Sequence, residues 1–164
     1  MKNHVVVLGY GPLTRPVLDK LGRRTRYVVV ATDPELAERL RGRGYDVVES
    51  ETVSEDALYE AGIREARAVV VASDSDADDA LAVLTANEAA PGIVVSAADE
   101  ENVHKLHRAG ADTVISPASI VGDLLVKSAL TGEDTGSVAD EVLRKELGDG
   151  EGADGFEEDE ASES

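Results

Sequence analysis

The sequence lacks cysteine altogether, and no long hydrophobic run interrupts it. Without cysteine the chain can form neither a disulfide nor a thiolate metal site. No apolar run approaches the roughly 20 residues that span a bilayer, so direct membrane insertion is not expected. The first residues lead straight into an apolar run, which predicts that no secretory signal peptide is present.

Basic side chains are also scarce, with 16 Lys and Arg against 34 Asp and Glu and a formal net charge of -18. Nucleic-acid-binding proteins carry the opposite balance, so no nucleic-acid partner is expected. Residues 133–164 hold 13 acidic and 2 basic residues, and arginine outnumbers lysine by 11 to 5. An acidic, lysine-poor surface suits concentrated salt, where charge repulsion is screened within ~3 Å. We therefore expect a halophilic source.

Short Val- and Ile-rich runs alternate with stretches of helical periodicity up to about residue 130. Strands are predicted at residues 4–8, 27–31, 46–49, 68–72, 93–95 and 113–115. Continuous apolar runs, rather than alternating ones, are typical of parallel strands covered on both faces. The alternation of strands and helices predicts an α/β fold with a doubly wound Rossmann-type parallel sheet of six strands in the order 3-2-1-4-5-6, with helices on both faces.

We expect one such domain over residues 1–131, a hinge and short acidic helix over 132–147, and a disordered acidic tail over 148–164. The tail is mostly Gly, Asp, Glu and Ser, which bury too little apolar surface to offset the entropy of ordering. Within the domain, residues 76–89 form an alanine-rich helix that is predicted to turn Leu81 and Leu84 inward. The last helix, from 117 to 130, carries apolar residues with no evident partner in one domain.

The loop Gly9-Tyr10-Gly11-Pro12-Leu13-Thr14 follows the first strand and opens a helix. In a strand–turn–helix context this spacing predicts a phosphate-binding loop, because the helix N-terminus offers unpaired N–H groups and partial positive charge. Gly9 permits the tight turn, and Gly11 lets a pyrophosphate approach the backbone. Thr14 stands at the third glycine position. Its side chain either holds helix and strand apart or bonds locally through its hydroxyl.

Acidic residues follow two of the strands. Asp33 lies near the expected ribose-binding position but two residues late, and it is favoured as the N-cap of the next helix, with Pro34 in the first turn. A second group, Asp74, Asp76, Asp78 and Asp79, follows the fourth strand. Such acids favour a helix N-terminus, and this interpretation is preferred over a cation site.

The three histidines, His4, His104 and His107, are predicted to be structural. No Ser-His-Asp or Cys-His arrangement emerges, so nucleophilic catalysis is not expected.

Four segments carry a resemblance to a known family: HVVVLGYG at 4–11, ATDPELAERL at 31–40, LYEAGIREARAVVVASDSD at 58–76 and AGADTVISP at 109–117. Over roughly residues 3–130 the chain resembles the nucleotide-binding N-lobe of the regulator-of-potassium-conductance (RCK, or TrkA-N) family. The resemblance implies a non-enzymatic cytoplasmic lobe, held at the inner face of the membrane by its partner. It also implies that the lobe binds NAD(H), ATP, ADP or AMP and shifts the gate of a potassium channel or Trk-type uptake system.

The residues that the loop and the resemblance together point to as nucleotide contacts are Gly9, Tyr10, Gly11, Pro12, Leu13, Thr32, Asp33, Glu51, Ser73 and Asp74. Two positions at which the family pattern has a charged residue carry an uncharged one in this sequence. The Asp that ends the second strand is Ala31, and the Arg at the end of the fifth strand is Ser96. Each lost charge-assisted hydrogen bond is worth ~1.5–3 kcal/mol. The pocket is therefore expected to bind weakly or to take a different nucleotide.

The resemblance further implies self-association as a homodimer or higher ring, and a membrane potassium channel or transporter subunit as partner. The family's second lobe is missing, so the chain is either one lobe of a larger protein or a stand-alone subunit. Two alternatives stay open. One is a relic Rossmann scaffold that mediates assembly without tight ligand binding. The other is an NAD(P)-dependent oxidoreductase, which lacks a substrate domain here.

Overall fold

The computed structural model describes residues 1–90, 92–132 and 144. The elements in chain order are β1 (Val5–Leu8), α1 (Thr14–Leu21), β2 (Tyr27–Ala31), α2 (Pro34–Gly42), β3 (Val47–Glu49), α3 (Glu55–Glu60), the 3-10 turn η1 (Ile63–Glu65), β4 (Ala68–Val71), α4 (Asp76–Ala89), β5 (Val94–Ala97), the 3-10 turn η2 (Glu100–Asn102), α5 (Val103–Ala109), β6 (Thr113–Ile115) and α6 (Pro117–Thr131). The strand ends lie within two residues of the predicted ones.

All the strands pair in parallel, in the order β3-β2-β1-β4-β5-β6. This confirms the predicted doubly wound topology. The chain leaves β1 towards β2 and β3 on one side, and later returns to β4 on the other side of β1. Ligands of open α/β sheets bind at this switch point, outside the carboxyl ends of the strands.

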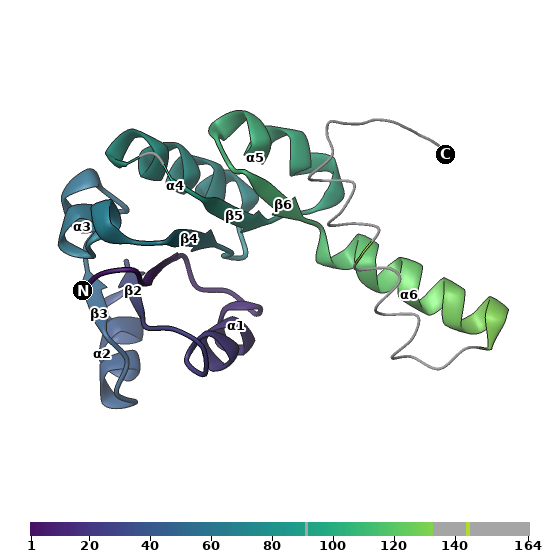
Figure 1. Cartoon of the computed structure of the whole chain (residues 1–164), viewed down its shortest axis with the longest axis horizontal. Helices are drawn as coiled ribbons and strands as arrows, with labels where there is room; N and C mark the ends of the chain where they lie inside the picture. The colour runs from purple at the N-terminus through teal and green to yellow at the C-terminus, as the bar shows by residue number, and fades with distance from the viewer. Residues whose placement is uncertain (91, 133–143, 145–164) are drawn as a thin grey trace.

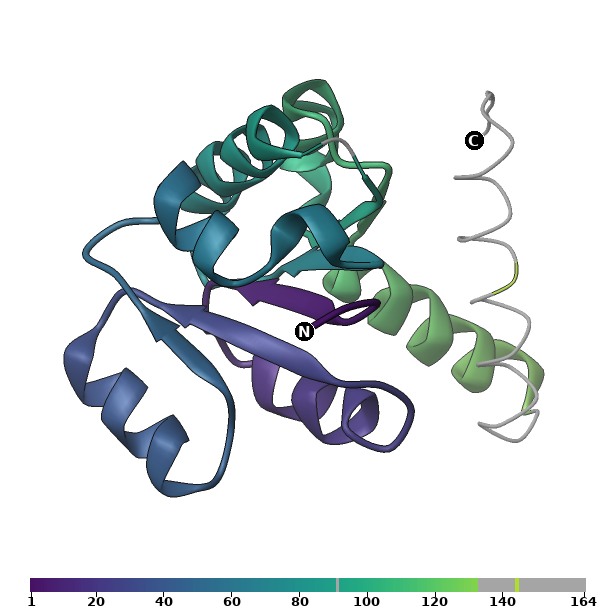
Figure 2. The same cartoon turned by 60° about the vertical axis from the view of Figure 1, so that its left-hand side comes forward.

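Helices cover both faces of the sheet (Figures 1 and 2). On one face α1 and α2 pack Leu18 and Leu40 against Val5, Val7 and Val29. The other face is larger and packs residues of α3, α4 and α5 against β1, β2 and β4. All four residues of β1 are buried, which explains why its sequence is a continuous apolar run.

The inward face of α4 differs from the prediction. Leu81 is 64% exposed and Leu84 is 44% exposed, so the expectation that they turn inward is wrong. The buried residues of α4 are instead mostly small, and one of them is acidic: Asp79, Ala82, Val83, Ala86 and Ala89. Small residues let the helix lie close to the sheet, which explains why they occupy its buried face.

His4 is fully buried just before β1, and its Nε2 lies 2.8 Å from the carbonyl oxygen of Ala61. His107 Nδ1 lies 3.0 Å from the carbonyl oxygen of Ala111. Both histidines therefore bond to backbone carbonyls, as structural histidines do.

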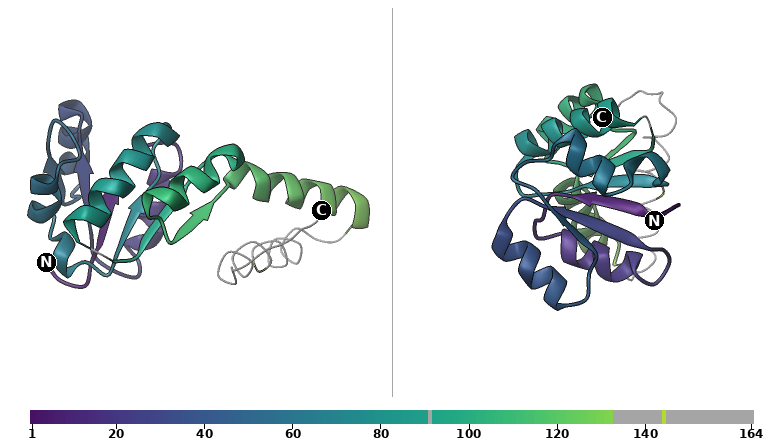
Figure 3. Two further views of the ribbon diagram at one scale, coloured as in Figure 1. Left: turned by 90° about the horizontal axis from the view of Figure 1, so that it is seen from above. Right: turned by 90° about the vertical axis from the view of Figure 1, so that its left-hand side faces the viewer.

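The last helix, α6, contributes no buried residue to the domain and extends away from the sheet and the helices that cover it (Figures 1 and 3). Its most exposed apolar side chains are Val121, Leu125, Val126 and Leu130. Among the described residues, no helix is long and apolar enough to cross a membrane. The helix ends at Thr131, and the predictions made for residues 133–147 and 148–164 fall outside the described part of the chain, residue 144 excepted.

Candidate functional site

The switch point holds a cleft of about 680 Å³ at the carboxyl ends of β1, β2 and β4. Seven of the predicted contact residues line it together: Gly9, Tyr10, Thr32, Asp33, Glu51, Ser73 and Asp74. They come from four separate turns that only the parallel sheet brings to one edge. The volume falls within the range of about 300–1,000 Å³ that small-molecule sites occupy.

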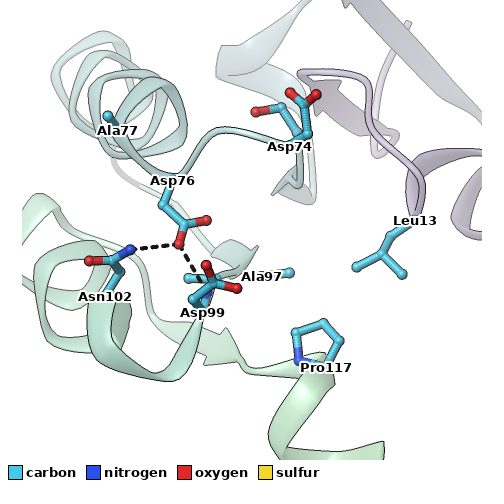
Figure 4. A pocket seen from close by; sticks show the side chains of 10 residues that line it. Leu13, Asp74, Asp76, Ala77, Ala97, Asp99, Asn102 and Pro117 are labelled. Carbon is cyan, nitrogen blue, oxygen red and sulfur yellow. Dashed lines mark hydrogen bonds between the residues drawn. The ribbon is translucent and has the colours of Figure 1, made fainter.

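A second, smaller cleft of about 340 Å³ lies on the β5–β6 side, and Ser73 and Asp74 line both clefts. Figure 4 shows Leu13, Pro117, Asp74, Asp76 and Asp99 around it. The turn after β4 therefore divides the edge of the sheet into two halves.

Asp76 connects two of the segments that line this smaller cleft (Figure 4). Its Oδ2 accepts hydrogen bonds from the backbone N–H of Asp99 at 3.0 Å and from Nδ2 of Asn102 at 2.8 Å. The carboxylate thus links the start of α4 to the turn after β5.

The glycine loop is fixed by its contact with the β4–α4 turn. Gly9 has a φ of 79°, and a Cβ there would lie 2.9 Å from Cβ of Ser73. A Cβ on Gly11 would lie 2.9 Å from both the amide nitrogen of Asp74 and the carbonyl carbon of Ser73. Both glycines are therefore required by loop-to-loop packing, whether or not a ligand is present. Gly11 therefore has a packing role in addition to its expected role of letting a ligand approach the backbone.

Thr14 stands at the third glycine position, and its side chain makes two hydrogen bonds. Its buried hydroxyl accepts from the backbone N–H of Gly11 at 2.9 Å and donates to the carbonyl oxygen of Ala72 at 3.1 Å. Of the two predicted alternatives, the local bond is the one observed. It ties the loop both to its own helix and to the end of β4.

Few backbone donors remain open in the loop. Pro12 is exposed, has no N–H and lines neither cleft, and the N–H of Gly11 is taken by Thr14. Within the described residues, the N–H groups of Gly9, Tyr10 and Leu13 have no hydrogen-bond acceptor. These three amides are the donors that an anionic group at the loop would meet first.

Asp33 is the N-cap of α2, since its Oδ1 accepts from the backbone N–H of Glu35 at 3.0 Å. The favoured capping interpretation is therefore confirmed, and the side chain also borders the larger cleft. Ala31, at the position where the resemblance implies an acid, lies at the end of β2 in the wall of the same cleft. Ser96 is buried within β5 and donates to the carbonyl oxygen of Val71 at 2.9 Å.

The larger cleft is acidic. Asp33, Glu51, Asp74, Asp78 and Asp79 line it, and no Lys, Arg or His is among its described lining residues. A phosphate entering it meets repulsion from these carboxylates, opposed by the backbone dipoles of the loop. Over residues 1–90 and 92–132 no group of three or more His, Cys, Asp or Glu is placed to hold a metal ion.

Asp79 is a residue of the larger cleft whose burial and hydrogen bonds were not predicted from the sequence. It is 1% exposed, and its carboxylate accepts from the Ser73 hydroxyl at 2.6 Å and from the Ser73 backbone N–H at 3.1 and 3.2 Å. Its pKa is raised, first by burial and then by the nearby carboxylates of Asp76 and Asp78, although the bonds from Ser73 act in the opposite direction. Asp79 is separated from Ala82, Val83 and Ala86 by the spacing of one helix face, and this spacing is the sequence signal that places Asp79 on the buried face.

Residues 5–117 match the TrkA-N domain family. The voltage-gated potassium channel Kch of Escherichia coli strain K12 is 30% identical over 141 residues, covering 81% of this chain and 33% of that channel. A probable potassium channel protein 2 of Methanocaldococcus jannaschii is 30% identical over 128 residues, covering 74% of this chain and 37% of that protein. The chain thus spans about a third of the length of these curated relatives.

Among solved structures, GsuK bound to ADP superimposes with a TM-score of 0.71 at 25% identity, covering 88% of this chain and 42% of that chain. The GsuK channel bound to NAD gives 0.67 at 24% identity, covering 76% and 23%. The latter likeness supports the fold alone. Because the family match extends over residues 5–117, more than half of the sequence, the protein belongs to the TrkA-N domain family.

Proposed function

We propose that the chain is a nucleotide-sensing regulatory domain or subunit of a potassium channel or Trk-type potassium uptake system. The observation that carries the proposal is the cleft of about 680 Å³ at the switch point, bordered by a glycine loop with three open amides. Membership of the TrkA-N family and 30% identity to two potassium channels support the transport context. On this proposal the domain lies in the cytoplasm, at the inner face of the membrane that holds its partner.

The ligand that we propose is NAD(H) or an adenine nucleotide such as ATP, ADP or AMP. The ADP-bound GsuK structure covers 88% of this chain and supports this class of ligand. The diphosphate lies at the N–H groups of Tyr10 and Leu13, and the ribose and base lie towards Thr32, Asp33 and Glu51. Binding regulates a gate only if the ligand prefers one arrangement of the assembled domains over another.

The acidic lining favours a second candidate, a Rossmann scaffold that mediates assembly without tight ligand binding. Five carboxylates and no basic side chain border the cleft among the described residues. A pocket evolved for tight binding of phosphates usually places Arg or Lys opposite them. The two candidates differ in one measurable property, the affinity for nucleotide.

A panel of NAD, NADH, ATP, ADP and AMP, tested by thermal unfolding in 2 M KCl, separates the candidates. A ligand present at a hundred times its Kd stabilises by about 2.7 kcal/mol, or roughly 5–10 °C for a chain of this size. A shift with any of the five supports the sensor. No shift with any of them favours the scaffold, and turnover of NADH with a small carbonyl would contradict a purely regulatory role.

We further propose that α6 mediates a homodimer, the building unit of a higher ring. The helix buries no residue in its own domain, and Leu125 and Leu130 are 65% and 81% exposed. Large exposed apolar patches in a folded protein usually mark interaction sites. The helix extends beyond the sheet, so a second copy can reach it without displacing the core (Figure 3).

Replacing Leu125 by aspartate is expected to convert the dimer to a monomer, because the buried charge lacks a partner in an apolar interface. Sedimentation velocity in 2 M KCl measures the change, which we expect to be at least a tenfold rise in the dimer dissociation constant. Ile93→Asp is the matched control, since Ile93 is 57% exposed and lies far from α6 in sequence. A wild-type chain that sediments as a monomer at high concentration would contradict the proposed dimer.

A further inference from the structure

Asp79 occupies an unusual position for an ionisable group. Its carboxylate is buried under the glycine loop, where Oδ1 lies 3.5 Å from the point that a Cβ on Gly9 would occupy. It also belongs to the wall of the larger cleft. The proposed phosphate site and a buried carboxylate therefore share the same loop.

The contacts of Asp79 hold the turn that shapes the cleft. Ser73 donates both its hydroxyl and its backbone N–H to this one carboxylate. Ser73 in turn contacts the glycine loop, at the two points where Cβ atoms on Gly9 and Gly11 would collide with it. A single side chain thus connects α4, the β4–α4 turn and the glycine loop.

The charged groups around Asp79 do not neutralise it. On α4 its neighbours are Asp76 and Asp78, both of which act to raise its pKa. The β4–α4 turn contributes Asp74, the glycine loop contributes only the Tyr10 phenol, and across the cleft lie Asp33 and Glu51. No cationic side chain is among these described residues. A buried charge is screened much less than an exposed one, so Asp79 acts on the cleft more strongly than its neighbours do.

We propose that Asp79 is a specificity-determining residue of the nucleotide cleft, setting through its buried charge how strongly the cleft accepts phosphate-bearing ligands. The inference rests on the proposed function, because it concerns the same site. Ionised, Asp79 opposes a diphosphate at the loop. Protonated, it keeps an acceptor oxygen for Ser73 and no longer opposes the diphosphate. Binding of an anionic nucleotide is therefore coupled to uptake of a proton.

The direction of the pH dependence follows from burial. Burial raises the pKa of Asp79 above its ordinary value in the free protein, and a bound diphosphate raises it further. Affinity for the nucleotide is therefore lowest above both pKa values and rises as the pH falls through them. NAD is the suitable probe, because its two phosphates are diesters whose charge does not change between pH 5 and 8.

The test compares wild type with Asp79→Asn, using NAD and adenosine as ligands in calorimetric titrations at fixed high salt. Removing the buried charge is expected to tighten NAD roughly tenfold and to change adenosine, which has no phosphate, by less than about twofold. The control is Asp78→Asn, the same substitution at an exposed lining residue one position earlier, expected to tighten NAD by less than about threefold. The NAD affinity of wild type rises from pH 8 to pH 5, and that of Asp79→Asn rises less.

The outcomes distinguish failure of the inference from failure of the proposed function. If NAD and adenosine affinities change by the same factor in Asp79→Asn, the residue acts only through the shape of the turn and the inference is overturned. The same holds if wild-type NAD affinity falls towards pH 5. If no ligand binds to any of the proteins, the proposed nucleotide function fails and the inference fails with it. Asp79→Asn is isosteric, and its thermal transition at pH 7 is expected to equal or exceed that of wild type, because the buried charge is gone.

Discussion

Replacing Gly11 by alanine is expected to separate the glycine loop from the β4–α4 turn and to weaken nucleotide binding. The new Cβ would lie 2.9 Å from the backbone nitrogen of Asp74 and the backbone carbon of Ser73. Backbone atoms cannot rotate away as a flexible side chain can, so one of the two loops must move. Overpacking of this kind costs about 1–3 kcal/mol, and thermal unfolding measures it. We expect NAD affinity to fall at least tenfold, because the open amides of Tyr10 and Leu13 move with the loop.

Gly42→Ala is the matched control for this substitution. Gly42 is the last residue of α2, and a Cβ there meets no heavy atom within 4 Å. Alanine is favoured over glycine in helices by up to about 1 kcal/mol, so this variant is expected to be neutral or slightly more stable. A Gly11→Ala protein that unfolds and binds NAD like wild type would contradict the packing role assigned to the loop.

Raising KCl from 0.1 M to 2 M is expected to stabilise the protein strongly. The formal net charge is -18, and at 0.1 M salt these charges repel one another over about 10 Å, against about 3 Å at 1 M. If screening recovers about 3 kcal/mol of repulsion, the thermal transition rises by roughly 10 °C for a chain of this length. Differential scanning calorimetry at several salt concentrations measures the effect.

A neutral osmolyte at matched osmolality is the control, because it favours the compact state by exclusion from the surface without screening charge. KCl is expected to stabilise the chain more than the osmolyte does. A transition temperature in dilute buffer equal to that in 2 M KCl would contradict both the role of charge repulsion and the proposed halophilic adaptation.

The fold was predictable from the sequence because its signals are local. Continuous apolar strands and glycine-ended helices specify a parallel sheet without any knowledge of long-range contacts. The cap at Asp33 is likewise encoded within three residues, and its bond to the N–H of Glu35 is found in the structure. The hydroxyl of Thr14 supplies a local bond of the predicted kind, to the N–H of Gly11.

The parts that were missed depend on contacts between distant turns. Size and hydrophobicity favoured Leu81 and Leu84 as the buried side of α4, whereas close packing selected the small residues. Asp79 looked like one more acid at a helix N-terminus, because its partner Ser73 lies in the turn before the helix. The packing constraint on Gly11 comes from a turn more than 60 residues away in sequence.

On the proposed function, a nucleotide binds at the glycine loop of the larger cleft. Hydrogen–deuterium exchange of the wild-type chain with and without NAD, in 2 M KCl, tests it most directly. We expect slower exchange in peptides that cover residues 9–15 and 73–79, where the open amides and the Asp79 turn lie. Exchange that NAD leaves unchanged in both segments, or slows only in α6, would contradict it.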